Sequence, residues 1–180
     1  MLYVAFLRGI NVGGNRKVEM KRLKQLFEQL SLGNVKTYIN SGNIIFFDQA
    51  HSKKQLVEIL EKAIQAEFGF FVKVMLRDFA ELKTINDALP DDWTNDSAMK
   101  CDVMLLGEKI DHLIAFKQLT IKEKIDIVKS VKGAILWRVD RDNVTRSGIL
   151  KLVGTQLYKE MTIRNCNTMR KLLVLMESMD

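Results

Sequence analysis

The fold is decided by the stretch Val35-Lys-Thr-Tyr-Ile-Asn-Ser-Gly-Asn-Ile-Ile-Phe-Phe47. Apolar or β-branched residues occupy every second position up to Ile39, which predicts a strand with one buried face. Ser41-Gly42 is a turn signal, and the unbroken apolar run from Ile44 to Phe47 predicts a second strand that is buried on both faces. The stretch therefore predicts a β-hairpin.

Strand and helix patterns on both sides of the hairpin complete a βαββαβ unit. An apolar run from Leu2 to Leu7 predicts the first strand, and apolar residues at helical spacing from Met20 to Leu30 predict the first helix. A capping box, Ser52 with Gln55, begins the second helix, and Phe71 to Arg77 predicts the fourth strand. This order is the ferredoxin-like arrangement. Its central strands are the first and third, and these are the two with continuous apolar runs.

The rest of the chain predicts a less regular mixture of helices and strands. The expected elements are a helix from Asp78 to Leu89, a linker loop over 90–100, a strand over 102–107, one or two helices over 111–129, a strand over 134–139, a short strand at 144–145, a helix over 149–158 and a last helix capped by Asn167.

The fold class is therefore α+β. We expect an N-terminal ferredoxin-like (βαββαβ) subdomain over residues 1–78, packed on a second, smaller α+β subdomain over residues 79–180 that ends in two helices. A degenerate repeat of the first unit is an alternative for the second half, although no residue-level similarity supports it.

The composition is that of an ordinary globular protein: of 180 residues, 47% are hydrophobic and 28% are charged. The apolar stretches are too short to span a bilayer, and no basic region precedes the apolar start, so we expect neither a membrane segment nor a secretory signal. Cys101 and Cys166 have no metal-binding spacing and form no disulfide framework. We therefore expect a cytoplasmic protein with no metal site and no membrane partner.

The net charge of +6 is concentrated in the N-terminal half of the chain. Residues 1–79 contain 12 basic and 7 acidic side chains, a net of +5, which leaves +1 for residues 80–180. This excess favours an anionic partner, either nucleic acid or a phosphorylated small molecule. A solvated surface without a partner is the competing interpretation.

A glycine-rich loop, Arg8-Gly-Ile-Asn-Val-Gly-Gly-Asn-Arg-Lys17, connects the first strand to the first helix. Its glycines allow backbone N–H groups to gather around an anion, the helix N-terminus adds its dipole, and Arg8, Arg16 and Lys17 supply positive charge. The loop matches neither the Walker pattern nor the dinucleotide-binding pattern. A turn that needs glycines at positive φ is the alternative explanation.

The hairpin turn should lie beside this loop. Asn40, Ser41, Gly42 and Asn43 are good turn residues on their own. In a βαββαβ unit, however, the end of the first strand and the turn between the second and third strands lie at the same end of the sheet. We therefore expect the loop and the turn to converge on one site.

A third polar segment, Thr162-Ile-Arg-Asn-Cys-Asn-Thr168, precedes the last predicted helix. It suits an anion at a helix N-terminus, and an asparagine N-cap with a neighbouring ion pair is the competing interpretation. The candidate ligand-binding residues of the three segments are Arg8, Gly9, Asn11, Gly13, Gly14, Lys17, Asn40, Ser41, Gly42, Asn43, Arg164 and Asn165.

Catalytic constellations are largely absent. His51 follows the third strand, at the end of the sheet opposite the glycine-rich loop, and His112 lies in a predicted helix. Neither is placed to activate Ser41 or Cys166. The sequence therefore assigns no catalytic residue, names no cofactor and leaves open whether the protein is an enzyme.

Three motifs resemble one bacterial family. They are Ala5-Phe-Leu-Arg-Gly-Ile-Asn-Val-Gly-Gly14, Thr37-Tyr-Ile-Asn-Ser-Gly-Asn-Ile-Ile-Phe46, and Thr162-Ile-Arg-Asn-Cys-Asn-Thr168 with Lys171-Leu after it. In order, and over essentially the whole chain, they are similar to the family called domain of unknown function 1697. The chain departs from it at Cys166, where an aromatic residue is expected. The resemblance implies a cytoplasmic α+β protein with ferredoxin-like units, and it marks the same three segments.

The leading hypothesis is a protein that binds a small anionic ligand, phosphate-like or nucleotide-like. Arg8 would pair with the negative charge, and Gly13 and Gly14 would donate backbone N–H groups. The asparagines of the loop and the turn would orient the rest of the ligand.

Two alternatives stay open. The first is a nucleic-acid-binding module on the basic N-terminal half. Its candidate stacking residues are Tyr3, Phe6, Phe46 and Phe47, for which core packing is the better explanation because no RNA-recognition signature accompanies them. The second is a protein-interaction or homo-oligomeric role through the edge strand Phe71 to Arg77 or the methionine-rich last helix.

Overall fold

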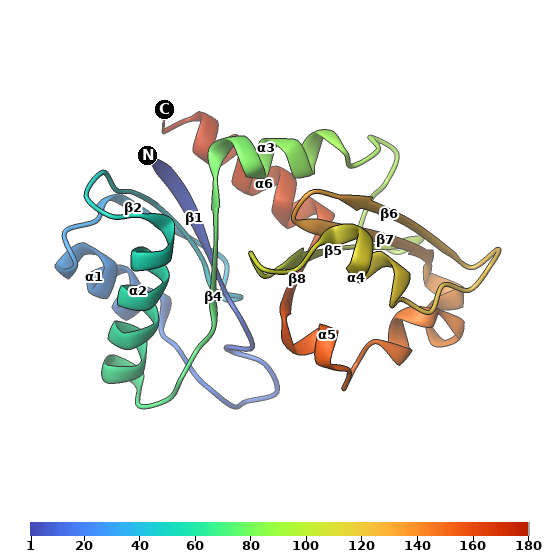
Figure 1. Cartoon of the computed structure of the whole chain (residues 1–180), viewed down its shortest axis with the longest axis horizontal. Helices are drawn as coiled ribbons and strands as arrows, with labels where there is room; N and C mark the ends of the chain where they lie inside the picture. Colours follow the sequence, from blue (N-terminus) through green and yellow to red (C-terminus); the bar gives the residue numbers. More distant parts are fainter. Residues whose placement is uncertain (180) are drawn as a thin grey trace. The chain divides into compact units, whose positions relative to one another are not determined.

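The predicted hairpin is part of a four-stranded antiparallel sheet (Figure 1). The computed structural model describes residues 1–179 and divides into two compact units, Met1–Ala80 with Val174–Asp180, and Glu81–Leu173. The first unit contains β1 (Leu2–Leu7), α1 (Met20–Gln29), β2 (Gly33–Tyr38), β3 (Asn43–Phe47), α2 (Lys53–Phe68) and β4 (Val74–Asp78). The strand order β2-β3-β1-β4 confirms the βαββαβ arrangement and places β1 and β3 in the centre.

Both helices cover one face of this sheet, and the core of the unit lies between the two layers (Figure 1). Phe27 of α1 packs edge-to-face on Phe46 of β3, with ring centroids 5.5 Å apart. Tyr3 and Phe6 of β1 point to opposite faces of the sheet, and both are buried. Three of the four candidate stacking aromatics are therefore core residues, and only Phe47, 36% exposed, reaches the surface.

The two helices of the first unit begin differently. At α2 the predicted capping box is present, with Ser52 Oγ accepting the N–H of Gln55 and Gln55 Oε1 accepting the N–H of Ser52. At α1 the N-cap residue, Glu19, forms no side-chain cap hydrogen bond, and no acidic side chain lies in the first turn. The first N–H groups of α1 therefore have no side-chain acceptor at the cap, and the only acidic side chain in the cap and first turn is that of Glu19 itself.

A second four-stranded antiparallel sheet forms the other unit. After α3 (Phe79–Asp87) the chain forms β5 (Met99–Leu106), α4 (His112–Lys117), β6 (Asp126–Val131), β7 (Ala134–Asp140), the 3₁₀ helices η1 (Arg141–Arg146) and η2 (Gly148–Lys151), α5 (Gln156–Lys159), β8 (Met161–Asn165) and α6 (Cys166–Glu177). The residues that the structure describes include no helix long and apolar enough to cross a membrane.

The second sheet repeats the topology of the first. Its strand order, β6-β7-β5-β8, corresponds strand by strand to β2-β3-β1-β4. The correspondence extends to a buried arginine on the last strand, since Val4 pairs with Arg77 in one sheet and Val103 with Arg164 in the other. Each arginine donates a 2.8 Å hydrogen bond from Nη1 to the carbonyl of the residue before it. The second unit is therefore a repeat of the first in topology.

Several predictions for the second unit are wrong. Of the one or two helices predicted over 111–129, the structure has α4, which ends at Lys117, and residues 126–131 form β6. Residues 144–145 lie in η1 rather than in a strand, and the helix predicted over 149–158 divides into η2 and α5. Residues 161–165 form the unpredicted β8, and Asn165 Oδ1, not Asn167, accepts an N–H in the first turn of the last helix, that of Thr168 at 2.9 Å. The edge strands β6 and β8 are short, and their partners β7 and β5 fix their conformation through pairing that local periodicity does not reveal.

A buried carboxylate, Asp126, connects the start of β6 with the loop that leads to β8. It accepts N–H groups from Gly148 and Lys122, each at 2.8 Å, the indole N–H of Trp137 at 3.1 Å and the hydroxyl of Ser147. Burial alone would raise the pKa of Asp126, but these hydrogen bonds lower it further than burial raises it. The group therefore stays ionised and stabilises the unit.

Gly42 in the hairpin turn should be the least replaceable glycine of the first unit. Its φ is +79°, and a Cβ there would lie 2.7 Å from Ile10 Cδ1 and 2.8 Å from Leu7 Cβ. Gly69 has nearly the same φ, +81°, with nothing within 4 Å. Gly69→Ala should therefore lower the free energy of unfolding by about 1–2 kcal/mol, the cost of the left-handed backbone alone. Gly42→Ala should lower it by about 2–5 kcal/mol, because overpacking adds to that cost. Equal losses of unfolding free energy in the two variants, measured by urea unfolding, would contradict this packing.

Candidate functional site

The glycine-rich loop and the hairpin turn meet at one end of the first sheet. The backbone N–H of Leu7 donates to the carbonyl of Gly42 at 2.8 Å, and the side chain of Asn11 donates to the carbonyl of Asn40 at 2.7 Å. The loop before β4 lies at the same end, because the N–H of Arg8 donates to the carbonyl of Lys73 at 3.0 Å. The structure therefore brings together the first two predicted segments.

The side-chain amide of Asn11 holds the loop in place. Its Nδ2 donates to the carbonyl of Val18 at 2.9 Å as well as to Asn40, and its Oδ1 accepts the N–H of Val18 at 2.8 Å. The backbone of Asn11 is left-handed, with φ at 54°, a conformation that asparagine adopts more readily than most residues. We call these three contacts the Asn11 bridge. Because Oδ1 and Nδ2 of Asn11 both bond to the protein backbone, the Asn11 side chain fixes the conformation of the loop rather than contacting a ligand.

Asn43 has a similar structural role in the hairpin. Its side chain is fully buried, and Nδ2 donates to the carbonyl of Tyr38 at 3.0 Å and to Ser41 Oγ at 2.9 Å. By contrast, Asn40 is exposed and Ser41 is half-buried. The turn therefore presents the side chain of Asn40 at the surface, while Asn43 fixes the course of the backbone.

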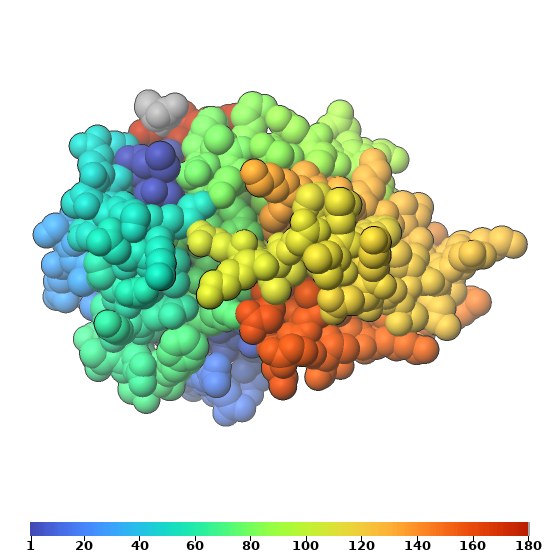
Figure 2. Space-filling view, in the orientation of Figure 1, coloured from blue at the N-terminus to red at the C-terminus, as the bar shows by residue number. Residues whose placement is uncertain are grey.

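The segment between the two ends of the Asn11 bridge is open to solvent. Gly13 and Gly14 have φ of 61° and 77°, and a Cβ on either would meet nothing within 4 Å. Within residues 1–179, their N–H groups donate no hydrogen bond, and the side chains of Arg16 and Lys17 form none and no ion pair. Figure 2 shows part of this loop in blue at the lower edge of the surface. Free N–H donors and unpaired cations thus lie within five consecutive residues.

A hollow of about 390 Å³ lies against this segment, at the start of α1. Its lining residues are Asn11, Gly14, Lys17, Val18 and Glu19. Arg8 is half-buried at the end of β1, and Arg16 Nη1 lies 4.0 Å from the position that a Cβ on Gly9 would occupy. The hollow therefore combines a glycine backbone, a lysine and the N-terminus of α1, which suit an anion, with one carboxylate, that of Glu19.

The third predicted segment has structural contacts of its own in the second unit. Arg164 is buried, and its Nη1 donates to Thr162 Oγ1 at 3.0 Å in addition to the carbonyl of Ile163; burial lowers its pKa to about 10. Asn165 accepts the N–H of Thr168 at the start of α6. Asn165 therefore caps α6, which is one half of the competing interpretation of this segment, and Arg164 contributes to β8 through its contacts with Thr162 and Ile163.

The comparisons with known proteins agree with this fold. A family model described as "Protein of unknown function (DUF1697)" matches residues 1–137, which include the loop and the hairpin and end before Arg164. The chain belongs to this family. It is also similar to a solved structure, the conserved bacterial protein SP0830 from Streptococcus pneumoniae, with 32% identity, a TM-score of 0.81 and coverage of 97% of this chain and 98% of that chain. Among curated proteins, nothing matches the chain. The resemblance found in the sequence motifs is confirmed.

The two histidines of this DUF1697 member belong to other segments than the loop. His51 contacts Asp48, with Nδ1 3.1 Å from Oδ1, and its N–H donates to Asp48 Oδ2 at 2.9 Å. Burial raises the pKa of Asp48, but the hydrogen bonds from His51 lower it further, so the net shift is downward. His112 is exposed at the start of α4. No group of three His, Cys, Asp or Glu side chains within residues 1–179 is arranged to hold a metal ion.

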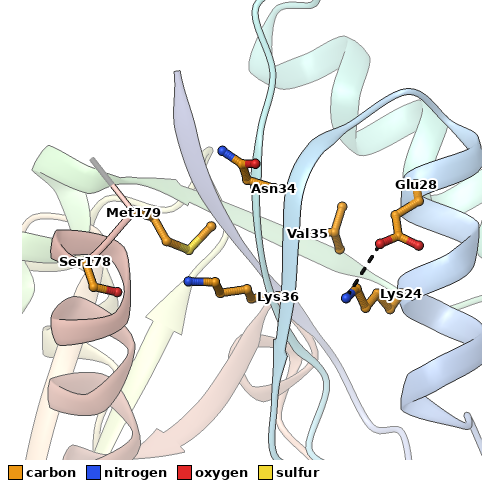
Figure 3. A pocket seen from close by; sticks show the side chains of 7 residues that line it. All are labelled: Lys24, Glu28, Asn34, Val35, Lys36, Ser178 and Met179. Carbon is orange, nitrogen blue, oxygen red and sulfur yellow. Dashed lines mark ion pairs between the residues drawn. The ribbon is translucent and has the colours of Figure 1, made fainter.

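A second hollow in the first unit is not predicted by the sequence. It has a volume of about 650 Å³ (Figure 3). The lining residues are Lys24, Glu28, Asn34, Val35, Lys36, Ser178 and Met179. Lys24 and Glu28 form an ion pair at 3.6 Å, so part of its charge is already neutralised. No local motif could have indicated this hollow, since its two lining segments are separated by more than half of the chain.

Removing the Asn11 side chain should loosen the loop. Asn11→Gly keeps the left-handed backbone unstrained and deletes only the bridge, so the loop should lose about 1–3 kcal/mol of local stability. Asn15→Gly is the matched control, because the exposed Asn15 side chain forms no hydrogen bond within residues 1–179. Hydrogen exchange should show faster exchange of the Val18 N–H in Asn11→Gly only. Unchanged protection of Val18 would show that the bridge does not hold the loop.

Proposed function

We propose that this protein binds a small anionic ligand, phosphate-like or nucleotide-like, at the glycine-rich loop beside the hairpin turn. The observation that carries the proposal is the combination of free N–H groups on Gly13 and Gly14 with the unpaired side chains of Arg16 and Lys17. Gly14 and Lys17 line the hollow at the start of α1, and Gly13 and Arg16 are their neighbours in the chain. Donors of this kind form charge-assisted hydrogen bonds with phosphate oxygens.

The charges around the start of α1 support an anion as the ligand. Lys17 and Lys21 flank a helix N-terminus, where the dipole disfavours positive charge, and Glu19 between them supplies one negative charge, so the three side chains carry a net +1. Arg22, in the same turn, is already paired with Glu67 of α2. A bound anion would offset the repulsion between the lysines and the dipole. It would also provide acceptors for the first N–H groups of the helix.

The proposed division of roles follows from the contacts already made. Lys17 and Arg16 would pair with the negative charge, joined by Arg8 at the end of β1. Gly13 and Gly14 would donate N–H groups, and the exposed Asn40 would contact the remainder of the ligand. Asn11 and Asn43 would position the loop and the turn. One carboxylate, that of Glu19, lines the hollow, and no group is assigned a chemical role, so the proposal is one of binding and derives no reaction step.

We place the protein in the cytoplasm because its thiols are free.

A nucleic-acid partner is the second candidate, and exposed apolar side chains at the same end of the sheet favour it. Val12 is 69% exposed, Ile39 49% and Phe71 52%. Ile39 also has a φ of 50°, which a β-branched residue rarely adopts. Apolar and aromatic groups beside Lys and Arg side chains are the composition of a surface for single-stranded nucleic acid. That function predicts a steep loss of affinity with added salt, whereas a compact anion site is less sensitive.

Thermal unfolding tests the proposal. The parent and Lys17→Gln are each measured with inorganic phosphate, nucleotides, sugar phosphates and short RNA, at low and at moderate salt. A small anion at 100 times its Kd should add about 2.7 kcal/mol of stability, a shift of roughly 5–10 °C, at both salt concentrations. Lys17→Gln should weaken binding by about 1.5–3 kcal/mol. Lys24→Gln is the matched control, because Lys24 pairs with Glu28 away from the loop.

The outcomes separate the two candidates. A shift with RNA alone, present only at low salt, would replace the small-anion site by the nucleic-acid surface. Equal shifts in the parent and Lys17→Gln would remove the loop as the site of either.

A further inference from the structure

Cys101 and Cys166 are 65 positions apart in the sequence and are neighbours in the second unit, at the point where β8 ends and α6 begins. The antiparallel ladder of β5 and β8 ends with Asp102 opposite Asn165, and Cys101 and Cys166 are the residues that directly adjoin this last pair. Both thiols are free and buried, and the Cys101 side chain hydrogen-bonds to that of Cys166.

The surroundings distinguish the two sulfurs. Cys166 is the first residue of α6, and Arg170 follows one turn later. The hydrogen bond from Cys101, the guanidinium of Arg170 and the N–H of Asn167 lower the pKa of Cys166 further than burial raises it. The hydrogen bond with Cys166 and burial raise the pKa of Cys101. Cys166 is therefore the thiol of the pair that ionises more readily, and Cys101 keeps its proton.

An irregular loop, residues 90–98, covers the cysteine pair. The first turn of α6 holds this loop in place by hydrogen bonds. Arg170 donates to the carbonyls of Trp93 and Pro90, each at 2.7 Å, and the Cys166 sulfur lies 3.5 Å from the Trp93 carbonyl. Asn95 contacts the backbone of β5 as well, since its Oδ1 accepts the N–H of Cys101 at 3.3 Å. Because residues 90–98 contain no helix or strand, this cover can open locally while both sheets stay intact.

We propose that Cys101 and Cys166 are a redox-active pair that a hydroperoxide converts to a reversible intramolecular disulfide. The Cys166 thiolate attacks one peroxide oxygen, the O–O bond breaks, and the second oxygen leaves with a proton as water or an alcohol. Cys166 is then a sulfenic acid. The Cys101 sulfur attacks the sulfur of Cys166, the S–O bond breaks, and the hydroxide leaves as water with the proton from Cys101. Two thiols lose two electrons and the peroxide gains them.

The first test is oxidation of the folded full-length chain by hydrogen peroxide, followed by thiol counting and non-reducing peptide mapping. The parent should lose both thiols together, give one peptide pair linked through Cys101 and Cys166, and recover both thiols with dithiothreitol. Cys101→Ser should instead accumulate a sulfenic acid at Cys166 that dimedone traps, and Cys166→Ser should stay reduced. Two retained thiols in the parent, cross-linked dimers, or independent oxidation of each cysteine would overturn the proposal.

The second test does not depend on access to the buried sulfurs. The chain is brought to equilibrium in glutathione buffers of graded composition, once folded and once in urea. Since the fold holds the sulfurs together, the equilibrium constant for disulfide formation should be at least about tenfold larger in the folded chain. An equal or smaller constant in the folded chain would show that the native geometry resists the bond. Neither test involves the anion site, so the two proposals stand or fall separately.

Discussion

The side-chain amide of Asn11 is the constraint on which the proposed site depends. It connects the glycine-rich loop to Val18, just before α1, and to Asn40 in the hairpin turn, with three hydrogen bonds of 2.7–2.9 Å. A loop of this length would otherwise sample many conformations and lose its ordering entropy on binding. Because the bridge fixes both ends, Gly13 and Gly14 are held at positive φ with their N–H groups unused. The donors are therefore arranged before a ligand arrives, which lowers the entropic cost of binding.

The two units have the same sheet topology but different helices and connections around it. Both have the same strand order and a buried arginine at the equivalent place on the last strand. The first unit covers its sheet with two helices of 10 and 16 residues, whereas the second has α4 and α5, of 6 and 4 residues, with 3₁₀ turns between β7 and α5. Asp126 and its four donors hold the loop of η2 in the second unit. The repeat therefore preserves the sheets and varies the connections, and the proposed anion site lies in one of these connections.

Sequence reasoning succeeded where a signal was local and failed where a partner was distant. The apolar runs of β1 and β3 and the capping box of Ser52 are local, and they predict the first unit nearly completely. The edge strands β6 and β8 have weak patterns, and pairing with β7 and β5 decides their conformation. The same holds for the candidate site. The βαββαβ topology predicted that the glycine-rich loop and the hairpin turn converge. It did not predict that the Asn11 amide would hydrogen-bond to Val18 and Asn40, nor that the pairing of β5 with β8 would bring Cys101 and Cys166 together.

An NMR titration of the uniformly nitrogen-15-labelled chain with inorganic phosphate observes the proposed donors themselves. If phosphate binds at the loop, the backbone amides of Gly13 and Gly14 should show the largest shifts, followed by those of Lys17 and the first turn of α1. They should share one saturating dependence on phosphate, and the amides of β8 should stay unchanged. Shifts that are spread over all lysine-rich surfaces without saturation, or unshifted amides of Gly13 and Gly14 when other amides have saturated, would show that the loop is not the anion site.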